Sequence, residues 1–112
     1  MIELRDQLRR FAAERDWDQF HSPKNLASAL SVEAAELLEH FQWLTEEESK
    51  RLPPAKVAAV RDELADVLIY LVRIADKLDV DLLAAAADKI AKNAVKYPAD
   101  QVRGSMKKYS DY

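Results

Sequence analysis

Two pairs of acidic residues stand out by their spacing: Glu33 with Glu36, and Glu63 with Asp66. The members of each pair are three residues apart, so they lie on one side of a helix. On helical wheels at about 100° per residue, each pair forms a stripe beside the apolar face of its segment. Two helices that pack through these apolar faces bring four carboxylates together. Such carboxylates repel one another, and their pKa values rise unless cations lie among them.

A divalent metal ion is the simplest answer to this repulsion. Magnesium fits the ligands, because it prefers hard oxygen atoms and commonly binds through a few carboxylates plus substrate phosphates. A di-iron site requires an E-x-x-H motif on each of two helices, whereas His40 follows Glu36 by four residues and His21 lies in a loop. The alternative is a charged surface, because structural ion pairs are much commoner than metal sites. The doubled motif favours the metal.

Four helices are expected to position these acids. Apolar periodicity and chain punctuation predict helices over about 2–15, 23–44, 55–78 and 81–96. Ser22 and Pro23 form a start signal, since serine is a good N-cap and proline tolerates the first helical position. Pro53 and Pro54 stop any continuing helix and let the third helix begin. The chain is therefore predicted to be all-α, with one domain over 1–98 and an irregular tail over 99–112.

Composition disfavours several classes of protein. Without cysteine, the chain has neither a disulfide framework nor a zinc–thiolate site. The net charge is −3, with 17 basic and 20 acidic residues interspersed, so binding to a nucleic-acid polymer is not expected. Gly104 is the only glycine, which removes every glycine-rich phosphate loop. No apolar run predicts a signal peptide or a membrane span, so we expect a cytoplasmic protein with no membrane partner.

Further motifs accompany the acid pairs. They are WDQFHSPKNL at 17–26, EAAELLEHFQW at 33–43, ELADVLIY at 63–70, KIAKNAVKYP at 89–98 and RGS at 103–105. Together they resemble the MazG-like all-α nucleoside triphosphate pyrophosphohydrolases, in the branch of the dCTP pyrophosphatases and their bacterial relatives. The resemblance extends over nearly the whole chain.

This resemblance implies a fold, an activity and a metal. The fold is a chain of four to five helices that forms a four-helix-bundle core completed by dimerisation, in a homodimer or homotetramer. The activity is Mg²⁺-dependent hydrolysis of a nucleoside triphosphate to monophosphate and pyrophosphate. The expected substrate is dCTP or a base-modified dCTP, in sanitation of the nucleotide pool. The implied magnesium ligands are Glu33, Glu36, Glu63 and Asp66.

The resemblance also assigns substrate residues position by position. Glu36 is the candidate general base, with Glu39 as the alternative if the helix is rotated relative to the wheel. Trp17, His21 and Trp43 match positions around the cytosine, where indoles stack on a base and a histidine donates or accepts a hydrogen bond at its edge. On the wheel, Trp43 lies away from the main apolar face, so a neighbouring subunit could complete the pocket. The other implied substrate ligands are Tyr70, Lys89, Asn93 and Tyr97.

Alternatives stay open at this point. The same scaffold could accept dUTP or another non-canonical triphosphate. It could be a regulator that binds nucleotide without efficient turnover, or a structural oligomerisation module, although acids on both helices argue against the module. The two tryptophans could belong to a core or a subunit interface, and the lysines to a solvated helix terminus. The tail over 103–109 could fold over bound phosphates or stay irregular.

Overall fold

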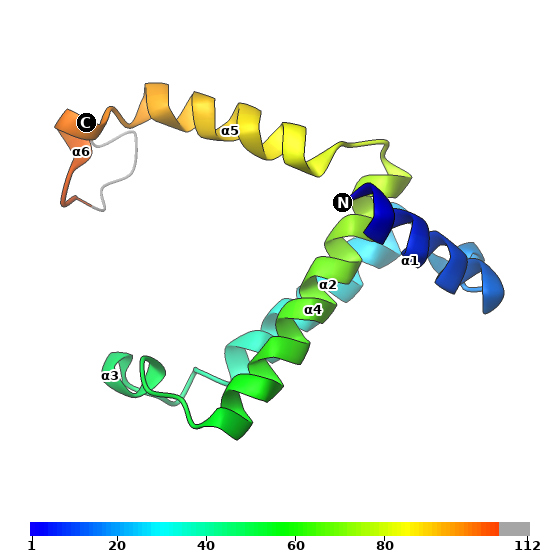
Figure 1. The fold of residues 1–112 in the computed structure, drawn as a ribbon, viewed down its shortest axis with the longest axis horizontal. Helices are drawn as coiled ribbons and strands as arrows, with labels where there is room; N and C mark the ends of the chain where they lie inside the picture. The colour runs from blue at the N-terminus through cyan, green and yellow to red at the C-terminus, as the bar shows by residue number, and fades with distance from the viewer. Residues whose placement is uncertain (106–112) are drawn as a thin grey trace. The chain divides into compact units, whose positions relative to one another are not determined.

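The structure, a computed structural model, describes residues 1–105, and every regular element in that range is a helix. The all-α fold predicted from the sequence is confirmed. None of these helices is long and apolar enough to cross a membrane. The part of the predicted tail over 106–112 lies outside the described residues. The elements are α1 (Ile2–Glu14), the 3-10 helix η1 (Asp18–Phe20), α2 (Pro23–Glu39), α3 (Glu46–Ser49), α4 (Pro54–Lys77), α5 (Leu82–Lys96) and α6 (Ala99–Val102) (Figure 1).

Local capping explains where two of the helices begin. The side chain of Ser22 accepts a hydrogen bond from the backbone N–H of Asn25 at 3.1 Å, and Pro23 occupies the first position of α2. The start signal predicted at Ser22 is therefore present. Thr45 and Glu48 form a capping box for α3, in which each side chain accepts from the other residue's backbone N–H.

Several predicted boundaries were wrong. The helix expected to run to about 44 ends at Glu39, and the chain turns over 40–43. Phe41 and Leu44 are half-buried, but they lie in or after this turn and not in a helix. Their spacing is the same as that of apolar residues in a helix, which is why the prediction extended α2 too far. The predicted loop over 16–22 contains η1, and the polar segment over 45–54 contains α3. The tail predicted to be irregular contains the single turn α6.

The helices α1 and α4 end with the same backbone turn. After each helix an aspartate takes a left-handed conformation, with φ of 54° at Asp16 and 55° at Asp79. The next N–H, that of Trp17 or Val80, bonds back over five residues to a helix carbonyl, at 2.9 and 2.8 Å respectively. This is the Schellman motif, which usually has glycine at the left-handed position. Aspartate is one of the few other residues that tolerate it.

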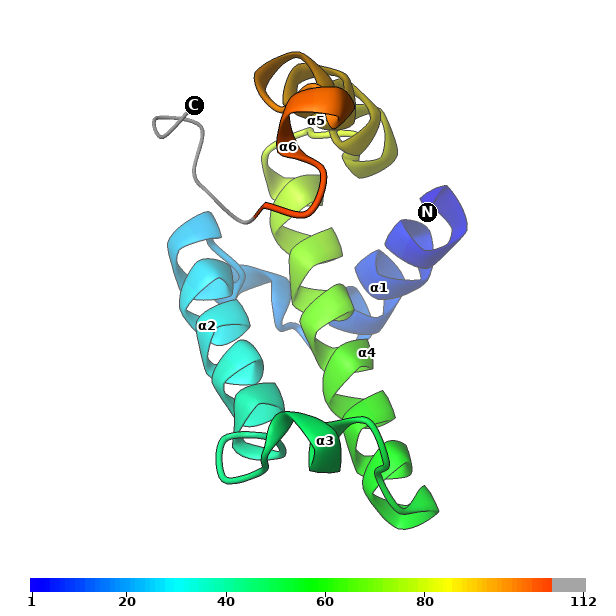
Figure 2. The same ribbon diagram turned by 90° about the vertical axis from the view of Figure 1, so that its left-hand side faces the viewer.

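The chain divides into two units, Met1–Val80 and Asp81–Tyr112. In the first unit α2 and α4 lie side by side and run in opposite directions, and α1 packs against α4 (Figure 2). Arg9 of α1 donates to Asp76 of α4 at 2.7 Å, which fastens this second contact. In the second unit no residue of α5 is fully buried. The predicted boundary between a domain over 1–98 and a tail stays a prediction. The fully buried apolar residues within 1–105 are Ala12, Leu26, Val72 and Ala75.

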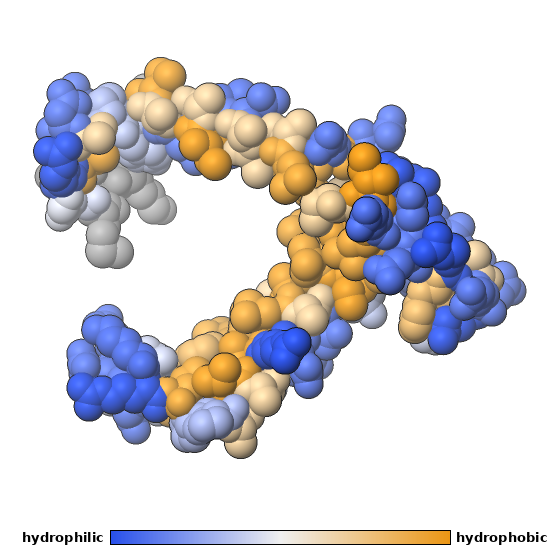
Figure 3. Space-filling view, in the orientation of Figure 1, coloured by the Kyte–Doolittle hydropathy of each residue, from blue (hydrophilic) through white to orange (hydrophobic). Residues whose placement is uncertain are grey.

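The face of α4 that packs against α2 differs in part from the face that the helical wheel predicted. The wheel placed Glu63 beside the packed face, whereas the structure places it on the face toward α2. Part of the apolar face predicted to pack is instead open, and Figure 3 shows apolar side chains along this part of the molecule. The reason is that α4 carries apolar residues around more than one side, so α2 covers only some of them. The exposed members form what we name the α4 apolar stripe, 38 to 56% exposed: Val57, Leu64, Leu68, Leu71 and Leu78.

Candidate functional site

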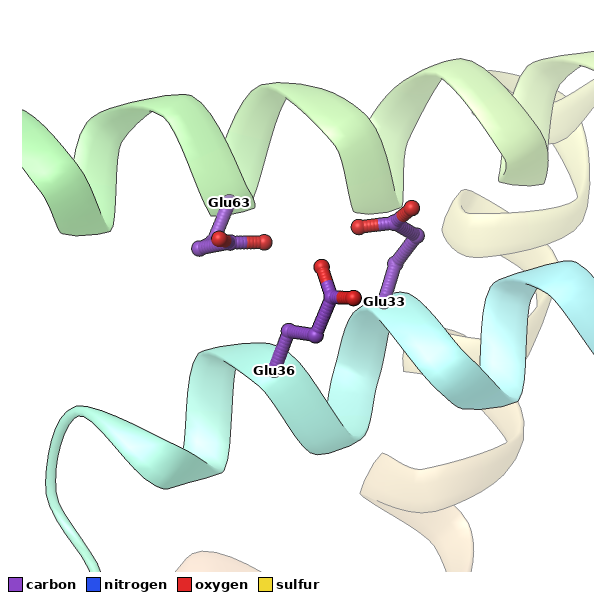
Figure 4. Close-up of side chains that lie close together, drawn as sticks. All are labelled: Glu33, Glu36 and Glu63. Carbon is purple, nitrogen blue, oxygen red and sulfur yellow. The ribbon is translucent and has the colours of Figure 1, made fainter.

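Three carboxylates meet between α2 and α4. Glu33 and Glu36 come from neighbouring turns of α2, Glu63 comes from α4, and their side chains point toward one another (Figure 4). One oxygen of each lies within 4.8 Å of the other two. All three residues are only partly exposed. The structure thus brings together three of the four acids that the sequence singled out.

The surroundings of Glu33 and Glu63 oppose the ionisation of these two carboxyl groups. Burial raises the pKa of Glu33 from 4.5 to about 7, and the neighbouring carboxyl group of Glu36 adds to this rise. The pKa of Glu63 is also raised, by burial first and then by the charge of Glu36. His40 offers a weak counter-charge, since its Nε2 lies 3.8 Å from Oε1 of Glu63. Within residues 1–105, no lysine or arginine forms an ion pair with these three carboxylates, and His40 is the one basic group beside them.

Two oxygens of the cluster are orphaned. Oε2 of Glu33 and Oε2 of Glu63 are buried and have no hydrogen-bond partner within the described part of the chain. Buried acceptors nearly always have a partner, and a bound cation would supply one to both. The donors are all carboxylate oxygens, which suit hard divalent ions rather than soft ones. The residues present therefore fit a divalent metal ion.

The next two turns of α4 carry Asp66 and Tyr70, both half-buried. The carboxylate of Asp66 is not among the three that converge, but its charge contributes to the raised pKa of Glu33 and of Glu63. Glu39, the alternative general base, is exposed at the last position of α2 and outside the cluster. A metal-ligating role for Asp66 and a substrate role for Tyr70 stay predictions.

A second group of residues surrounds η1, just before α2. Trp17 precedes η1 and packs edge-on against Phe11 of α1, with ring centres 5.8 Å apart. The guanidinium of Arg15 lies 3.6 Å from the centre of the Phe11 ring, on top of this pair. Trp17 is nevertheless 46% exposed, so much of the indole remains accessible. His21 directly follows η1 and is half-buried.

The sequence reasoning missed the residues that fasten η1 to α4. Arg73 is buried, with 4% of its side chain exposed, and its Nη2 lies 3.0 Å from Oδ1 of Asp18 and 3.2 Å from Nδ1 of His21. Lys77, one turn later, donates to the same oxygen of Asp18 at 2.6 Å. A signal was available, because Arg73 interrupts the apolar run VLIYLVRIA over 67–75. A cation in such a run needs partners when it is buried.

Comparison with known proteins agrees with this arrangement. The model of the MazG-like family matches residues 28–112, which include both acid pairs. The chain belongs to the MazG-like family.

Named relatives extend this result. Two curated relatives are both called dCTP pyrophosphatase 1: the mouse protein is 50% identical to this chain over 103 residues, and the human protein is 48% identical. Each match covers 90% of this MazG-like chain, which spans 61% of the length of either relative. A crystal structure of a pyrophosphatase from Archaeoglobus fulgidus superposes with a TM-score of 0.83 at 43% identity. That match covers 88% of this chain and 92% of the archaeal one.

Within the first unit, Trp43 of this MazG-like chain lies apart from the other predicted base-binding residues. Trp43 follows the far end of α2 and is 87% exposed. The 17 residues of α2 separate its two ends by about 25 Å, so Trp43 cannot share a pocket with His21 of the same chain. Lys89 and Asn93 are exposed on α5, and Tyr97 directly follows that helix, in the second unit. Their part in substrate binding stays a prediction.

Proposed function

We propose that this chain hydrolyses a nucleoside triphosphate to the monophosphate and pyrophosphate, with dCTP or a base-modified dCTP as its substrate. The observation that carries the proposal is the cluster of Glu33, Glu36 and Glu63, whose orphaned oxygens suit a divalent ion beside a triphosphate. The names of the mouse, human and archaeal relatives support the same reaction. The proposed role is removal of unwanted nucleotides from the cytoplasmic pool.

Mg²⁺ is the proposed metal. When bound, it neutralises phosphate charge and lowers the pKa of a bound water. Glu36 is the proposed general base, because its carboxyl group acts on the pKa of both neighbours and is therefore central in the cluster. It accepts a proton from the attacking water while the new O–P bond forms at the α-phosphorus and the bond from that phosphorus to pyrophosphate breaks. The proposed ligands of the metal are Glu33, Glu36, Glu63 and Asp66.

The proposed base pocket is shared between two copies of the chain. Trp17 and His21 come from one copy and Trp43 from its neighbour, since α2 holds the two ends of the set about 25 Å apart within one chain. Stacking on an indole contributes about 1 to 3 kcal/mol per base. The proposed ligands of the phosphates and sugar are Tyr70, Lys89, Asn93 and Tyr97.

The α4 apolar stripe supports a homodimer or homotetramer. Its members recur at intervals of three, four and seven residues, which is the spacing of a helix seam that packs against a partner helix. Covering such side chains contributes about 25 cal/mol for each Å² of apolar surface removed from water. The proposed partner is a second copy of the chain. We propose no nucleic-acid polymer and no membrane as a partner.

The proposal is tested by pyrophosphate release from the common ribo- and deoxynucleoside triphosphates, with Mg²⁺ and with EDTA. We expect Mg²⁺-dependent release that is fastest with dCTP and that falls at least about 100-fold in Glu63→Ala. Glu39→Gln is the matched control, because this exposed acid of the same site region lies outside the cluster, and it should keep the wild-type rate.

Each other outcome identifies an alternative. Faster release from dUTP or another triphosphate would support the proposed hydrolysis but show that cytosine is not the preferred base. Tight nucleotide binding without release would favour a regulator. A folded protein that neither binds nor hydrolyses any triphosphate would leave only the structural module.

A further inference from the structure

Arg73 reaches His21 as well as Asp18. Its Nη2 and Nε lie 3.2 Å and 3.4 Å from Nδ1 of His21, and its Nη1 lies 3.6 Å from Oδ2 of Asp76. Only 4% of the arginine side chain is exposed, whereas the side chain of Asp18 is 59% exposed, so water has little access to the guanidinium itself. Within residues 1–105, the buried guanidinium therefore has one imidazole nitrogen and two carboxylates around it.

The contact with Arg73 determines which nitrogen of His21 carries the proton. A guanidinium has five N–H donors and no acceptor, so Nδ1 must accept and therefore carries a lone pair. The ring is then neutral, with its proton on Nε2. Burial lowers the pKa of His21, and the charges of Arg73 and Lys77 lower it further, against the opposing charge of Asp18. Electrostatics and geometry thus favour the same neutral form.

The segment that carries His21 is fastened at both ends. At its start, Arg73 and Lys77 bind Oδ1 of Asp18 at 3.0 and 2.6 Å. At its end, the side-chain amide of Asn25 donates to the carbonyl of Phe20 at 3.0 Å. These contacts join η1 to both α4 and α2, directly before the histidine. The contacts of this segment therefore fix the position of His21, and the contact with Arg73 fixes its Nε2–H tautomer.

We propose that Arg73 is a positioning residue for base recognition, which holds His21 as a neutral Nε2–H donor and so favours a base with an acceptor at N3. N3 of cytosine is an acceptor, whereas N3 of uracil or thymine carries a hydrogen. A histidine that only donates discriminates between these bases, and a histidine free to exchange tautomers serves either. The inference rests on the proposed function, in which His21 reads the edge of the base.

The tautomer is tested on the folded protein without nucleotide. The chain has two histidines, His21 and His40, so ¹⁵N-labelled histidine gives two ring systems in an NMR spectrum, which His40→Gln assigns. We expect His21 to carry its proton on Nε2 at neutral pH. A proton on Nδ1 would overturn the proposal.

Three variants separate the effect of Arg73 on the histidine from its effect on the loop. Arg73→Gln is decisive, because an amide can donate to Nδ1 or accept from it and so permits both tautomers. Arg73→Lys keeps a cation that only donates. Lys77→Gln is the matched control, because it removes the other cation from Asp18, at 2.6 Å, and leaves the contact of Arg73 with His21. We expect mixed tautomers in Arg73→Gln alone.

Base discrimination is read from the binding of dCMP and dUMP, which needs no turnover, and from kcat/KM for dCTP and dUTP. We expect Arg73→Gln to reduce the preference for the cytosine nucleotide about tenfold, equal to about 1.4 kcal/mol and typical of one hydrogen bond. Arg73→Lys and Lys77→Gln should retain most of it. If Arg73→Gln does not fold, the proposal is judged by the tautomer of His21 in the wild type and by the base preference of Arg73→Lys and Lys77→Gln. A proton on Nδ1 in the wild type, or a loss of preference in Lys77→Gln that Arg73→Lys does not share, would then overturn it.

The outcomes distinguish this inference from the proposed function. Equal losses of preference in Arg73→Gln and Lys77→Gln would overturn the inference, because Arg73 would then act only through the loop. An unchanged preference in Arg73→Gln with altered tautomers would overturn it too. A wild type that prefers dCMP through Arg73 but hydrolyses no triphosphate would refute the proposed function and leave this inference standing.

Discussion

Replacing Glu33 with glutamine tests the electrostatics of the carboxylate cluster without any assumption about catalysis. The pKa of Glu33 rises from 4.5 to about 7, so the metal-free folded protein holds this proton more tightly than the unfolded chain does. The contribution of Glu33 to stability is therefore most favourable below pH 4.5 and declines as the pH rises to about 7. At about 1.4 kcal/mol for each pKa unit, a rise from 4.5 to about 7 means that the ionised residue costs the fold at most about 3.5 kcal/mol.

Urea unfolding in EDTA measures this cost. At about pH 8, Glu33→Gln should be more stable than the wild type by about 1 to 3 kcal/mol, because the amide has the shape of the carboxyl group without its charge. The difference should vanish well below pH 4.5, where the wild-type residue is protonated in both the folded and the unfolded state. Mg²⁺ should stabilise the wild type more than the variant, since a bound ligand adds to folding stability.

The matched control is Glu39→Gln, which removes an exposed acid from the same helix outside the cluster. It should show no such pH dependence. A difference between Glu33→Gln and wild type that is the same at pH 4.5 and pH 8 would refute the reasoning about burial and Glu36. Equal stabilisation of both proteins by Mg²⁺ would remove Glu33 from the proposed metal site.

Three further predictions concern the scaffold. In the wild type, the hydrogen bond from Arg9 lowers the pKa of Asp76, and Asp76→Asn weakens this contact. The contact stabilises the fold above the ordinary pKa of 3.8, and its contribution is lost as the pH falls through the lower pKa of the folded protein. Chemical unfolding should show a loss of about 1 to 3 kcal/mol at neutral pH that disappears in acid, and a pH-independent loss would contradict this. Ser22→Ala should lower stability by about 1 kcal/mol and Ser22→Gly by a few tenths; equal losses would argue against capping. Leu68→Glu places a charge in the α4 apolar stripe, so sedimentation should show a smaller assembly, and an unchanged mass would place the interface elsewhere.

Helix starts could be predicted from the sequence because their signals are local. Ser22 and Pro23 begin α2 through one hydrogen bond and one missing N–H, and both effects depend only on neighbouring residues. The end of α2 after Glu39 has no such signal, since no glycine or proline follows until Pro53. Phe41 continues the apolar spacing, and only its packing in the fold shows that it belongs to a turn.

The candidate site, like the helix boundaries, could be predicted from the sequence only in part. Spacing alone placed Glu33 and Glu36 opposite Glu63, because helices with acids beside their apolar faces have few ways to pack. Spacing could not show which side of α4 faces α2, since apolar residues occur on several sides of that helix. Nor could it find the contact of Arg73 with His21, because 52 residues separate the two in the chain.

The aspartates that end α1 and α4 have a consequence for the entropy of folding. Asp16 and Asp79 occupy left-handed positions where glycine is usual, and Gly104 is the only glycine in the chain. Glycine loses more backbone freedom on folding than any other residue, so this chain has less disorder to give up at its turns. Asp16 also accepts from the side chain of Gln19 at 3.0 Å, a contact that glycine could not make. The smaller entropy loss at these two turns is thus set against the strain of holding an aspartate in the left-handed region, which the contact of Asp16 with Gln19 partly offsets.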